Sequence, residues 1–279
     1  MREVHVNKIT KTIEDLCVKA CCHLGDDVKE LLKKRSLEET SEFGKNIFEQ
    51  IFANIQIAEL EGIPLCQDTG MAVVFLEVGQ DVHIVGGDLE AAVNEGVRRG
   101  YEKGYLRKSV LDPISRINTK DNTPAVIHTE IVPGDKLKII VAPKGFGSEN
   151  MSRLQMLKPS DGIEGVKDFI LQTVTSAGAN PCPPLIVGVG IGGTMEKAAL
   201  LAKKALLRRA GSHNPNPEIA RLEKEMLQRI NETGIGPQGL GGRVTALAVH
   251  IDTYPTHIAG LPVAVNLQCH VARHREAIL

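Results

Sequence analysis

Tryptophan is absent from the 279-residue sequence, and aromatic residues make up only 3% of it. Such a low aromatic content argues against the base-stacking surfaces of single-strand nucleic-acid binders and against an aromatic belt at a membrane interface. Long apolar runs are also missing, since no stretch approaches the roughly 20 residues that a membrane-spanning helix needs. The N-terminal residues MREVHVNKITKTIEDL mix charges of both signs and lack the apolar stretch of a signal peptide. We therefore predict a cytoplasmic protein.

An excess of charge of one sign is missing as well. The 33 Lys and Arg residues against 34 Asp and Glu residues give a net charge of −1, so no overall field draws the chain to nucleic acid or to an anionic membrane. Hydrophobic residues at 42% and charged residues at 24% are typical of a soluble globular protein. No internal repeat or linker is evident, and we predict one domain over residues 1–279.

The pattern of apolar residues predicts helices first and strands later. Residues 1–62 are expected to be helical, with Ser36-Leu-Glu-Glu39 in the form of a capping box. Strands are expected at 71–79, 81–87, 125–132, 136–142, 185–190, 244–255 and 261–270, and further helices at 88–103, 163–177, 194–209 and 217–232. The runs 125–132 and 136–142 flank Pro133-Gly134-Asp135 and predict a hairpin. We predict an α+β fold in which a mixed or antiparallel sheet packs with helices.

Closely spaced cysteine pairs of the C-x-x-C type are absent, which excludes a zinc ribbon and a thioredoxin-like site. Three of the six cysteines nevertheless stand in unusual segments: Cys66 in IPLCQDTG, Cys182 in ANPCPP and Cys269 in NLQCH. Prolines on both sides of Cys182 predict a rigid, extended backbone there. Spacing alone leaves two alternatives open, namely three buried inert thiols or three ligands that converge on an iron–sulfur cluster.

Four motifs occur in a fixed order along the chain: P-L-C-Q-D-T-G, K-G-F-G-S-E-N, N-P-C-P-P and T-H-I-A-G-L-P-V-A-V-N-L-Q-C-H. Together they resemble the N-terminal domain, or alpha subunit, of class I fumarases and of L-tartrate dehydratase, from about residue 50 to the C-terminus. The resemblance implies a hydro-lyase that reversibly hydrates fumarate to malate, a step of the tricarboxylic acid cycle. The alternative is dehydration of L-tartrate to oxaloacetate, and a more remote one is a non-catalytic redox or scaffold protein.

The same resemblance implies a 4Fe-4S cluster whose ligands are Cys66, Cys182 and Cys269. The fourth iron would have no protein ligand and would act as a Lewis acid on the substrate. The remaining thiols, Cys17, Cys21 and Cys22, lie on a predicted helix outside the motifs. A second metal site is the alternative there, and packing of small thiols in a helix interface is the expectation we favour.

Polar residues beside these cysteines are candidates for substrate chemistry. By resemblance, Asp68 and His257 are expected to be catalytic, although an aspartate in such a loop also serves as a turn residue. Contacts to the substrate are expected from Gln67, Arg107, Gly145, Gly147 and Ser148. Arg107 would hold a carboxylate in a bidentate fork, with Lys108 as a competitor for that role. The glycine-rich segment would offer backbone N–H groups to the other carboxylate.

Phe146 and His270 also bear on these motifs. The family that these motifs resemble often has three consecutive glycines in the segment 144–150, and Phe146 replaces the middle one. His270, next to Cys269, is expected to orient the ligand loop as a hydrogen-bond donor.

The segment 187–193, VGVGIGG, has the spacing of a dinucleotide-binding fingerprint. That fingerprint requires an acidic residue about 20 positions on, and no Asp or Glu occurs between Glu196 and Glu218. We therefore expect these glycines to allow close packing of a helix on a strand.

A second subunit is also expected. A buried dicarboxylate needs several cationic groups to offset its desolvation, and Arg107 is the one well-matched arginine in the motifs. The resemblance implies that further basic residues come from a second domain, whereas this chain ends at Leu279. We expect a separate beta subunit in an α2β2 heterotetramer, with activity only in its presence.

Overall fold

The computed structural model describes residues 2–279, and the contacts within the chain divide it into two compact units. The first unit contains the residues up to Leu24, 54–146 and 273–279. The second unit contains 25–53 and 147–272. Each unit combines helices with its own sheet, which confirms the predicted α+β class. That the units act as one domain stays a prediction.

The first unit is built on a four-stranded sheet with the order β10-β5-β2-β4. Its strands are β2 (Met71–Gly79), β4 (Val126–Val132), β5 (Leu137–Lys144) and β10 (Arg275–Ile278). Strand β2 pairs with β4 in parallel and with β5 antiparallel, so the sheet is mixed as predicted. Strand β2 matches the residues predicted for it, because its nearly continuous apolar sequence is typical of a strand that is buried on both faces.

The predicted hairpin of 125–132 and 136–142 is wrong. Both strands form, but β2 lies between them and neither pairs with the other. The reason is burial: β2 is buried along most of its length and takes the centre, whereas β4 is mostly exposed and lies at the edge. The turn that follows β4 passes across the end of β2, where Gly79 N–H donates to Lys136 O at 2.9 Å.

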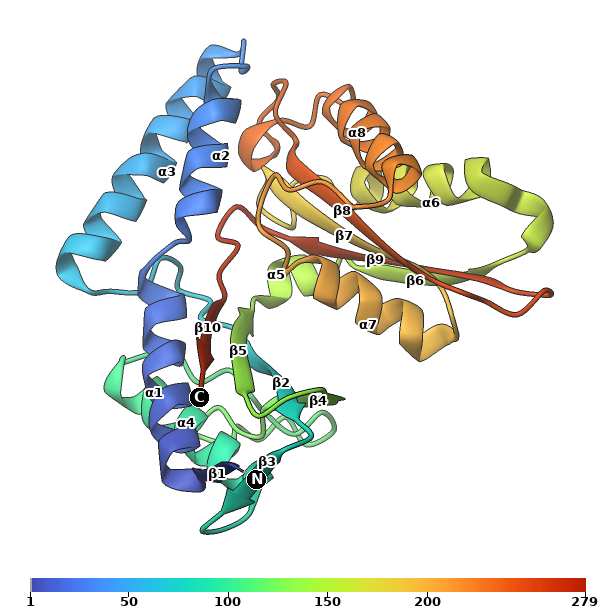
Figure 1. The fold of residues 1–279 in the computed structure, drawn as a ribbon. Helices are drawn as coiled ribbons and strands as arrows, with labels where there is room; N and C mark the ends of the chain where they lie inside the picture. Colours follow the sequence, from blue (N-terminus) through green and yellow to red (C-terminus); the bar gives the residue numbers. More distant parts are fainter. Residues whose placement is uncertain (1) are drawn as a thin grey trace. The chain divides into compact units, whose positions relative to one another are not determined.

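Helices α1 (Val6–Cys22) and α4 (Leu89–Lys103) pack on each other and cover the sheet of the first unit. Both are visible in Figure 1. Helix α4 begins where predicted, since Asp88 accepts the N–H of Ala91 as its N-cap. The helices cross closely at Gly100, because a Cβ built there would lie 2.7 Å from Cys17 Cβ.

The second unit repeats the strand arrangement of the first with the order β6-β9-β7-β8. Its strands are β6 (Arg153–Leu157), β7 (Leu185–Gly192), β8 (Ala246–Tyr254) and β9 (Leu261–Gln268). The central strand β7 pairs with β8 in parallel and with β9 antiparallel, as β2 does with β4 and β5. This shared topology was not evident from the sequence, because only the strand order is repeated.

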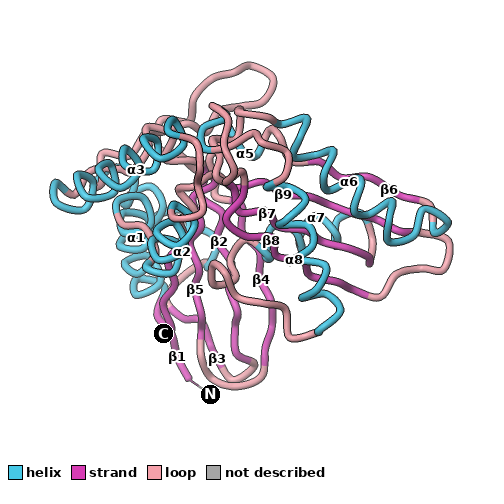
Figure 2. Tube along the Cα trace, turned by 90° about the horizontal axis from the view of Figure 1, so that it is seen from above, coloured by secondary structure: helices cyan, strands magenta, loops and turns pink. Residues whose placement is uncertain are grey.

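Three helices cover the sheet of the second unit: α6 (Gly162–Ala177), α7 (Met195–Ala205) and α8 (Pro217–Asn231). Helices α6 and α8 lie on one face and α7 lies on the other (Figures 1 and 2). On the α7 side, a Cβ at Gly188 would lie 2.2 Å from Ala202 O, and one at Gly190 would lie 2.1 Å from Ala198 O. The expectation that these glycines allow close helix–strand packing is confirmed.

The N-terminal region differs in part from its predicted helical character. Residues Arg2–His5 form strand β1, which pairs in parallel with β3 (Val82–Val85). Helices α2 (Asp26–Ser36) and α3 (Glu42–Glu61) follow α1 as expected. The capping box is wrong, because Ser36 ends α2 and its hydroxyl donates to Lys33 O at 2.8 Å. Among residues 2–279, none of the helices has both the length and the apolar character to cross a membrane.

Glu39 joins the connection between α2 and α3 to a distant loop of the same unit. Its carboxylate accepts the N–H groups of Thr40 and Ser41, and also those of Arg243 and Val244, all at 2.9 Å. The side chain is only 3% exposed. Burial by itself would raise the pKa of Glu39, but the backbone N–H donors more than offset it and the pKa is lowered.

This network predicts a pH-dependent loss of stability in Glu39→Gln. A group with a lowered pKa stabilises the fold above its unfolded pKa, about 4.3 for glutamate, and loses that effect as the pH falls through its folded value. We expect the free energy of unfolding to drop by about 1–3 kcal/mol at pH 7, because an amide cannot accept all these bonds. The deficit should shrink below about pH 4. Urea denaturation at pH 7 and below about pH 4 measures this deficit, with the exposed Glu38→Gln as control. An equal deficit at the two pH values would contradict the lowered pKa of Glu39.

Candidate active site

The loop that carries Cys66 connects α3 to β2 and is held by buried side chains of the first unit. Tyr101, which is 0% exposed, donates its hydroxyl to Thr69 O at 2.8 Å and lies 3.1 Å from Gly70 O. Gly70 has a φ of 77°, and a Cβ there would lie 2.7 Å from the backbone of Lys144. The loop is therefore fixed against the end of β5, and only glycine fits at its last position.

Asp68 lies in this loop, two residues after Cys66, and its carboxylate joins two segments. One oxygen accepts the N–H of Gly70 at 3.0 Å, which is the local turn expected of an aspartate. The other oxygen accepts the N–H of Phe146 at 2.9 Å, from the segment after β5. Asp68 therefore serves as a turn residue and also presents an oriented carboxylate beside Cys66.

The glycine-rich segment 144–150 forms a single helical turn, α5 (Phe146–Glu149), rather than an open loop. Its first N–H is already bound to Asp68, so this donor is engaged before any substrate arrives. Ser148 is only 3% exposed, whereas Gly147 is exposed. The Phe146 ring is 46% exposed and does not disturb the backbone bond to Asp68, which explains why a side chain is tolerated there.

Gln67 and Arg107, two of the predicted substrate-binding residues, contact each other. The Arg107 guanidinium donates to Gln67 Oε1 at 2.8 Å, and both side chains are exposed. The backbone of Arg107 is anchored, since Thr69 Oγ1 donates to its carbonyl at 3.0 Å. The buried Asn122 fixes the next residues by accepting the N–H of Ser109 at 2.7 Å and donating to Gly70 O at 3.2 Å. The Arg107 side chain is thus an exposed cation on a rigid backbone.

Several residues of this site were not identified from the sequence. Tyr101, Asn122 and Arg273 make hydrogen bonds to the loop 66–70 or to its neighbours, yet none stands in a recognisable spacing. Arg273 is 5% exposed and donates to Asp68 O and to Pro143 O, the latter at 3.4 Å. Its position four residues after Cys269 was the one available signal.

Cys182 and Cys269 belong to the second unit, in loops that are hydrogen-bonded to each other. The N–H of His270 donates to Cys182 O at 3.5 Å, and the His270 ring Nδ1 lies 3.2 Å from the same oxygen. His270 therefore contacts the Cys182 loop, and its expected role in orienting a ligand loop stays a prediction. Gln238, another residue not identified from the sequence, donates its backbone and side-chain N–H groups to Pro183 O, both at 2.8 Å.

The predicted extended backbone at Cys182 is wrong. Its φ is 56°, in the left-handed region that non-glycine residues seldom adopt. The N–H of Cys182 donates to Ala179 O at 3.0 Å. Hydrogen bonds from His270 and Gln238 hold the carbonyls of Cys182 and Pro183. A residue held in this conformation at a functional site presents its side chain at a fixed angle.

All six cysteines are free thiols, and they fall into two classes. Cys17, Cys21 and Cys22 are at most 1% exposed, and burial raises the pKa of each thiol, to about 12 for Cys21. This confirms their expected role as packing residues. Cys182 is exposed, and Cys66 and Cys269 are partly exposed. Within residues 2–279, the structure does not gather three or more His, Cys, Asp or Glu side chains into one metal-binding group.

His257 lies at the opposite end of the second unit's sheet from Cys269. It belongs to the turn before β9, whereas Cys269 follows the last residue of that strand. At about 3.3 Å per residue, the eight residues of β9 separate the two by roughly 25 Å. Its Nδ1 accepts the N–H of Ala259 at 3.2 Å, so the neutral ring carries its proton on Nε2. Within one chain, His257 and Cys269 do not contact the same small substrate.

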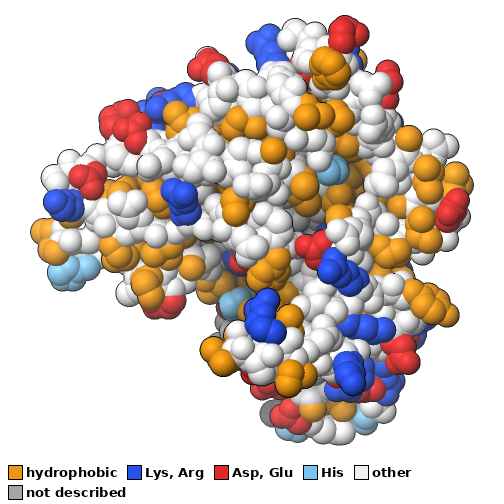
Figure 3. Space-filling model, turned by 180° about the vertical axis from the view of Figure 1, so that it is seen from behind, with side chains coloured by type: hydrophobic (Ala, Val, Ile, Leu, Met, Phe, Trp, Pro, Cys, Tyr) orange, Lys and Arg blue, Asp and Glu red, His pale blue; other side chains and the backbone are white. Residues whose placement is uncertain are grey.

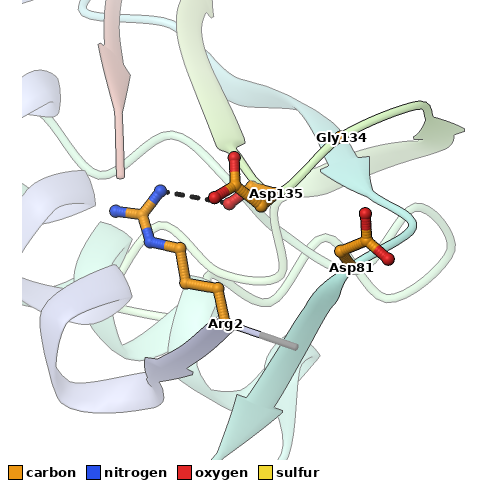
Figure 4. A pocket seen from close by; sticks show the side chains of 4 residues that line it. All are labelled: Arg2, Asp81, Gly134 and Asp135. Atoms are coloured by element: carbon orange, nitrogen blue, oxygen red, sulfur yellow. Dashed lines mark hydrogen bonds between the residues drawn. The ribbon is translucent and has the colours of Figure 1, made fainter.

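A cavity of about 540 Å³ in the first unit is lined by Arg2, Asp81, Gly134 and Asp135 (Figure 4). Arg2 donates to Asp135 O at 3.0 Å. The cavity lies beyond the last residue of β2, whereas Cys66 precedes the first, so it is remote from the candidate site. Figure 3 shows side chains of both charge signs spread over one face of the molecule, in keeping with the near-zero net charge.

Comparisons with known proteins place these features in a family. A family profile described as "Fumarate hydratase (Fumerase)" matches residues 10–278. A Methanocaldococcus jannaschii protein named "Putative L(+)-tartrate dehydratase subunit alpha" is 45% identical over 274 residues, which cover 95% of each chain. The L(+)-tartrate dehydratase subunit alpha of Escherichia coli K12 is 36% identical over 278 residues, which cover 98% of this chain and 91% of that protein. The chain therefore belongs to the fumarate hydratase family, which includes tartrate dehydratase alpha subunits.

Proposed function

We propose that the chain is the iron–sulfur alpha subunit of a hydro-lyase that adds water to fumarate to give malate. The observation that carries this proposal is the loop 66–70, which places a partly exposed thiol next to an oriented carboxylate and an exposed amide–guanidinium pair. These groups match the three needs of the reaction: a cluster ligand, a proton-transfer group and a carboxylate-binding group.

The donor set fits the proposed 4Fe-4S cluster in its chemistry. The ligands would be Cys66, Cys182 and Cys269, which are the three thiols that the fold leaves partly or fully exposed. The loops of Cys182 and Cys269 are already fixed to each other through His270. When bound, a cluster with one open iron would supply Lewis-acid polarisation of the substrate hydroxyl.

The chain's own residues would then position the substrate and move a proton. Arg107 and Gln67 would bind one carboxylate, with the guanidinium as a bidentate donor. Asp68 would exchange a proton with the substrate, because its carboxylate is held by two N–H donors in a fixed orientation. The exposed backbone at Gly147 offers a contact to the second carboxylate, together with Gly145 and Ser148 as the resemblance implies.

A separate beta subunit and a second copy of this chain would complete the enzyme. The relatives are named subunit alpha, which supports a beta partner for this chain in an α2β2 assembly. His257 lies roughly 25 Å from Cys269 along β9, so its catalytic role requires the site of another chain. In an assembly with two alpha chains, the His257 of one copy would then act on the substrate bound to the other.

L-tartrate is the second candidate substrate, because the relatives at 45% and 36% identity carry the name tartrate dehydratase. The experiment that separates the candidates is anaerobic purification of the chain, alone and with its beta partner, followed by assays with fumarate and with L-tartrate. We expect about four irons per chain, negligible turnover by the chain alone, and turnover of fumarate by the assembly. Faster turnover of L-tartrate would make tartrate dehydration the activity. A colourless, iron-free protein would contradict the cluster and favour a non-catalytic redox or scaffold protein.

A further inference from the structure

Arg273 is a buried cation beside the proton-transfer group of the proposed site. Its side chain is only 5% exposed, and it comes from the last segment of the first unit, just before β10. Burying a guanidinium is costly unless hydrogen bonds and a nearby negative charge compensate for the lost water. Packing alone therefore does not explain why an arginine is buried at this position.

The hydrogen bonds of Arg273 join the two segments that hold the Asp68 carboxylate. One nitrogen donates to Asp68 O, in the loop after Cys66, and Nε donates to Pro143 O at 3.4 Å, near the end of β5. The Asp68 carboxylate joins the same two segments through the N–H groups of Gly70 and Phe146. The guanidinium and the carboxylate therefore each link the loop after Cys66 to the segment at the end of β5.

The charge of Arg273 also lies next to the Asp68 carboxylate. A Cβ built on Gly145 would lie 3.2 Å from Asp68 Oδ2 and 3.7 Å from Arg273 Nη2, so both groups border the same small space. Both groups also act electrostatically on the same buried neighbour, Cys21. Glycine at this position leaves open the space that the carboxylate and the guanidinium share.

From this geometry we infer that Arg273 is a positioning residue, which fixes the Asp68 carboxylate for proton transfer and supplies a compensating positive charge. The inference rests on the proposed function, because it takes Asp68 as the proton-transfer group. A lysine would keep the charge but could not bridge two carbonyls with one planar fork. A methionine would remove both the charge and the bridge.

The test compares Arg273→Met and Arg273→Lys with Arg275→Met in the α2β2 assembly. Arg275 is a matched control, since its guanidinium in the same terminal segment donates to His23 O at 3.0 Å and Leu24 O at 3.2 Å. Per bound cluster, we expect kcat of Arg273→Met to fall on the order of 100-fold with KM within about threefold, since a slight misplacement of a reacting group has effects of this size. Arg273→Lys should fall less, and Arg275→Met should keep the wild-type kcat.

A double-mutant cycle separates positioning from a general loss of structure. In an Asp68→Asn background, Arg273→Met should change kcat by less than about threefold, because its effect acts through Asp68. Equal kcat per cluster in Arg273→Met and Arg275→Met would overturn the inference. So would a full additive loss in the Asp68→Asn background.

A second readout does not depend on turnover. In the same assemblies, amide hydrogen exchange should show faster exchange at Gly70 and Phe146 in Arg273→Met than in the wild type or Arg275→Met, because their N–H groups bind the carboxylate that Arg273 holds. If the wild-type assembly turned over neither substrate, the proposed function would fail, while this exchange pattern would still support the positioning of Asp68. Unchanged exchange at Gly70 and Phe146 in Arg273→Met would overturn the inference that Arg273 positions Asp68.

Discussion

Replacing Cys182 by serine is expected to abolish iron retention and to lower activity by at least about a hundredfold, because three thiolates are the full set of protein ligands for the proposed cluster. The same loss is expected for Cys66→Ser and Cys269→Ser. The structure strengthens the case for Cys182, whose backbone has a φ of 56° and is fixed by bonds from His270 and Gln238. Iron per chain, visible absorbance and turnover, measured anaerobically with the beta partner present, check this result.

Cys21→Ser is the matched control. Cys21 is 0% exposed, and its thiol lies 3.8 Å from Thr69 O, so a serine hydroxyl could make the same contact. We expect this variant to keep its iron and to lose about 1–3 kcal/mol in the free energy of unfolding, the cost of burying a hydroxyl in place of a thiol. A variant series in which Cys21→Ser lost the iron while Cys182→Ser kept it would refute the ligand assignment.

The second large effect is expected from hybrids of two inactive alpha chains. His257→Asn and Cys182→Ser should each be nearly inactive alone, the first for lack of a proton-handling group and the second for lack of a cluster. If His257 acts in the site of another copy, a hybrid with one chain of each kind contains one intact site. We then expect about half of the wild-type turnover per assembly, because a symmetric pair of alpha chains forms two equivalent sites.

The hybrids can be isolated with two affinity tags, and iron content should also be about half of the wild-type value because one chain in each pair lacks a ligand. His257→Asn should fold normally, since His257 is exposed in a turn and asparagine can accept the N–H of Ala259 in its place. An inactive hybrid would exclude action between copies. Full activity of His257→Asn alone would remove this histidine from the mechanism.

Local features of the fold were predictable from the sequence because their signals are local. A helix was predicted over 88–103, and helix α4 begins next to its N-cap Asp88. The continuous apolar run 71–79 gave strand β2 with its observed limits. The family was also predicted from the motifs, and the family profile and the relatives confirm it. The ligand and catalytic roles assigned to the motif residues remain predictions.

Features that depend on distant segments were not predictable in the same way. The backbone of Cys182 departs from the extended form that its prolines favour, because hydrogen bonds from His270 and Gln238 hold the neighbouring carbonyls. Arg273 and Tyr101 contact the Asp68 loop from segments without any motif, and the closeness of Arg273 to Cys269 along the chain was the one signal that could point to either. The two units share a strand order that leaves no trace in the residue pattern.

The sequence by itself determined the family, the identity of the helices and most strands, and the candidate residues, since each of these is encoded by short patterns along the chain. The tertiary structure decided which strands pair and which candidates contact each other. Strand β2 takes the place between β4 and β5 because it is the strand that is buried on both faces. His257 and Cys269 stand in one motif of the sequence, yet the extended strand between them holds them roughly 25 Å apart, because each residue of a β-strand adds about 3.3 Å along its axis.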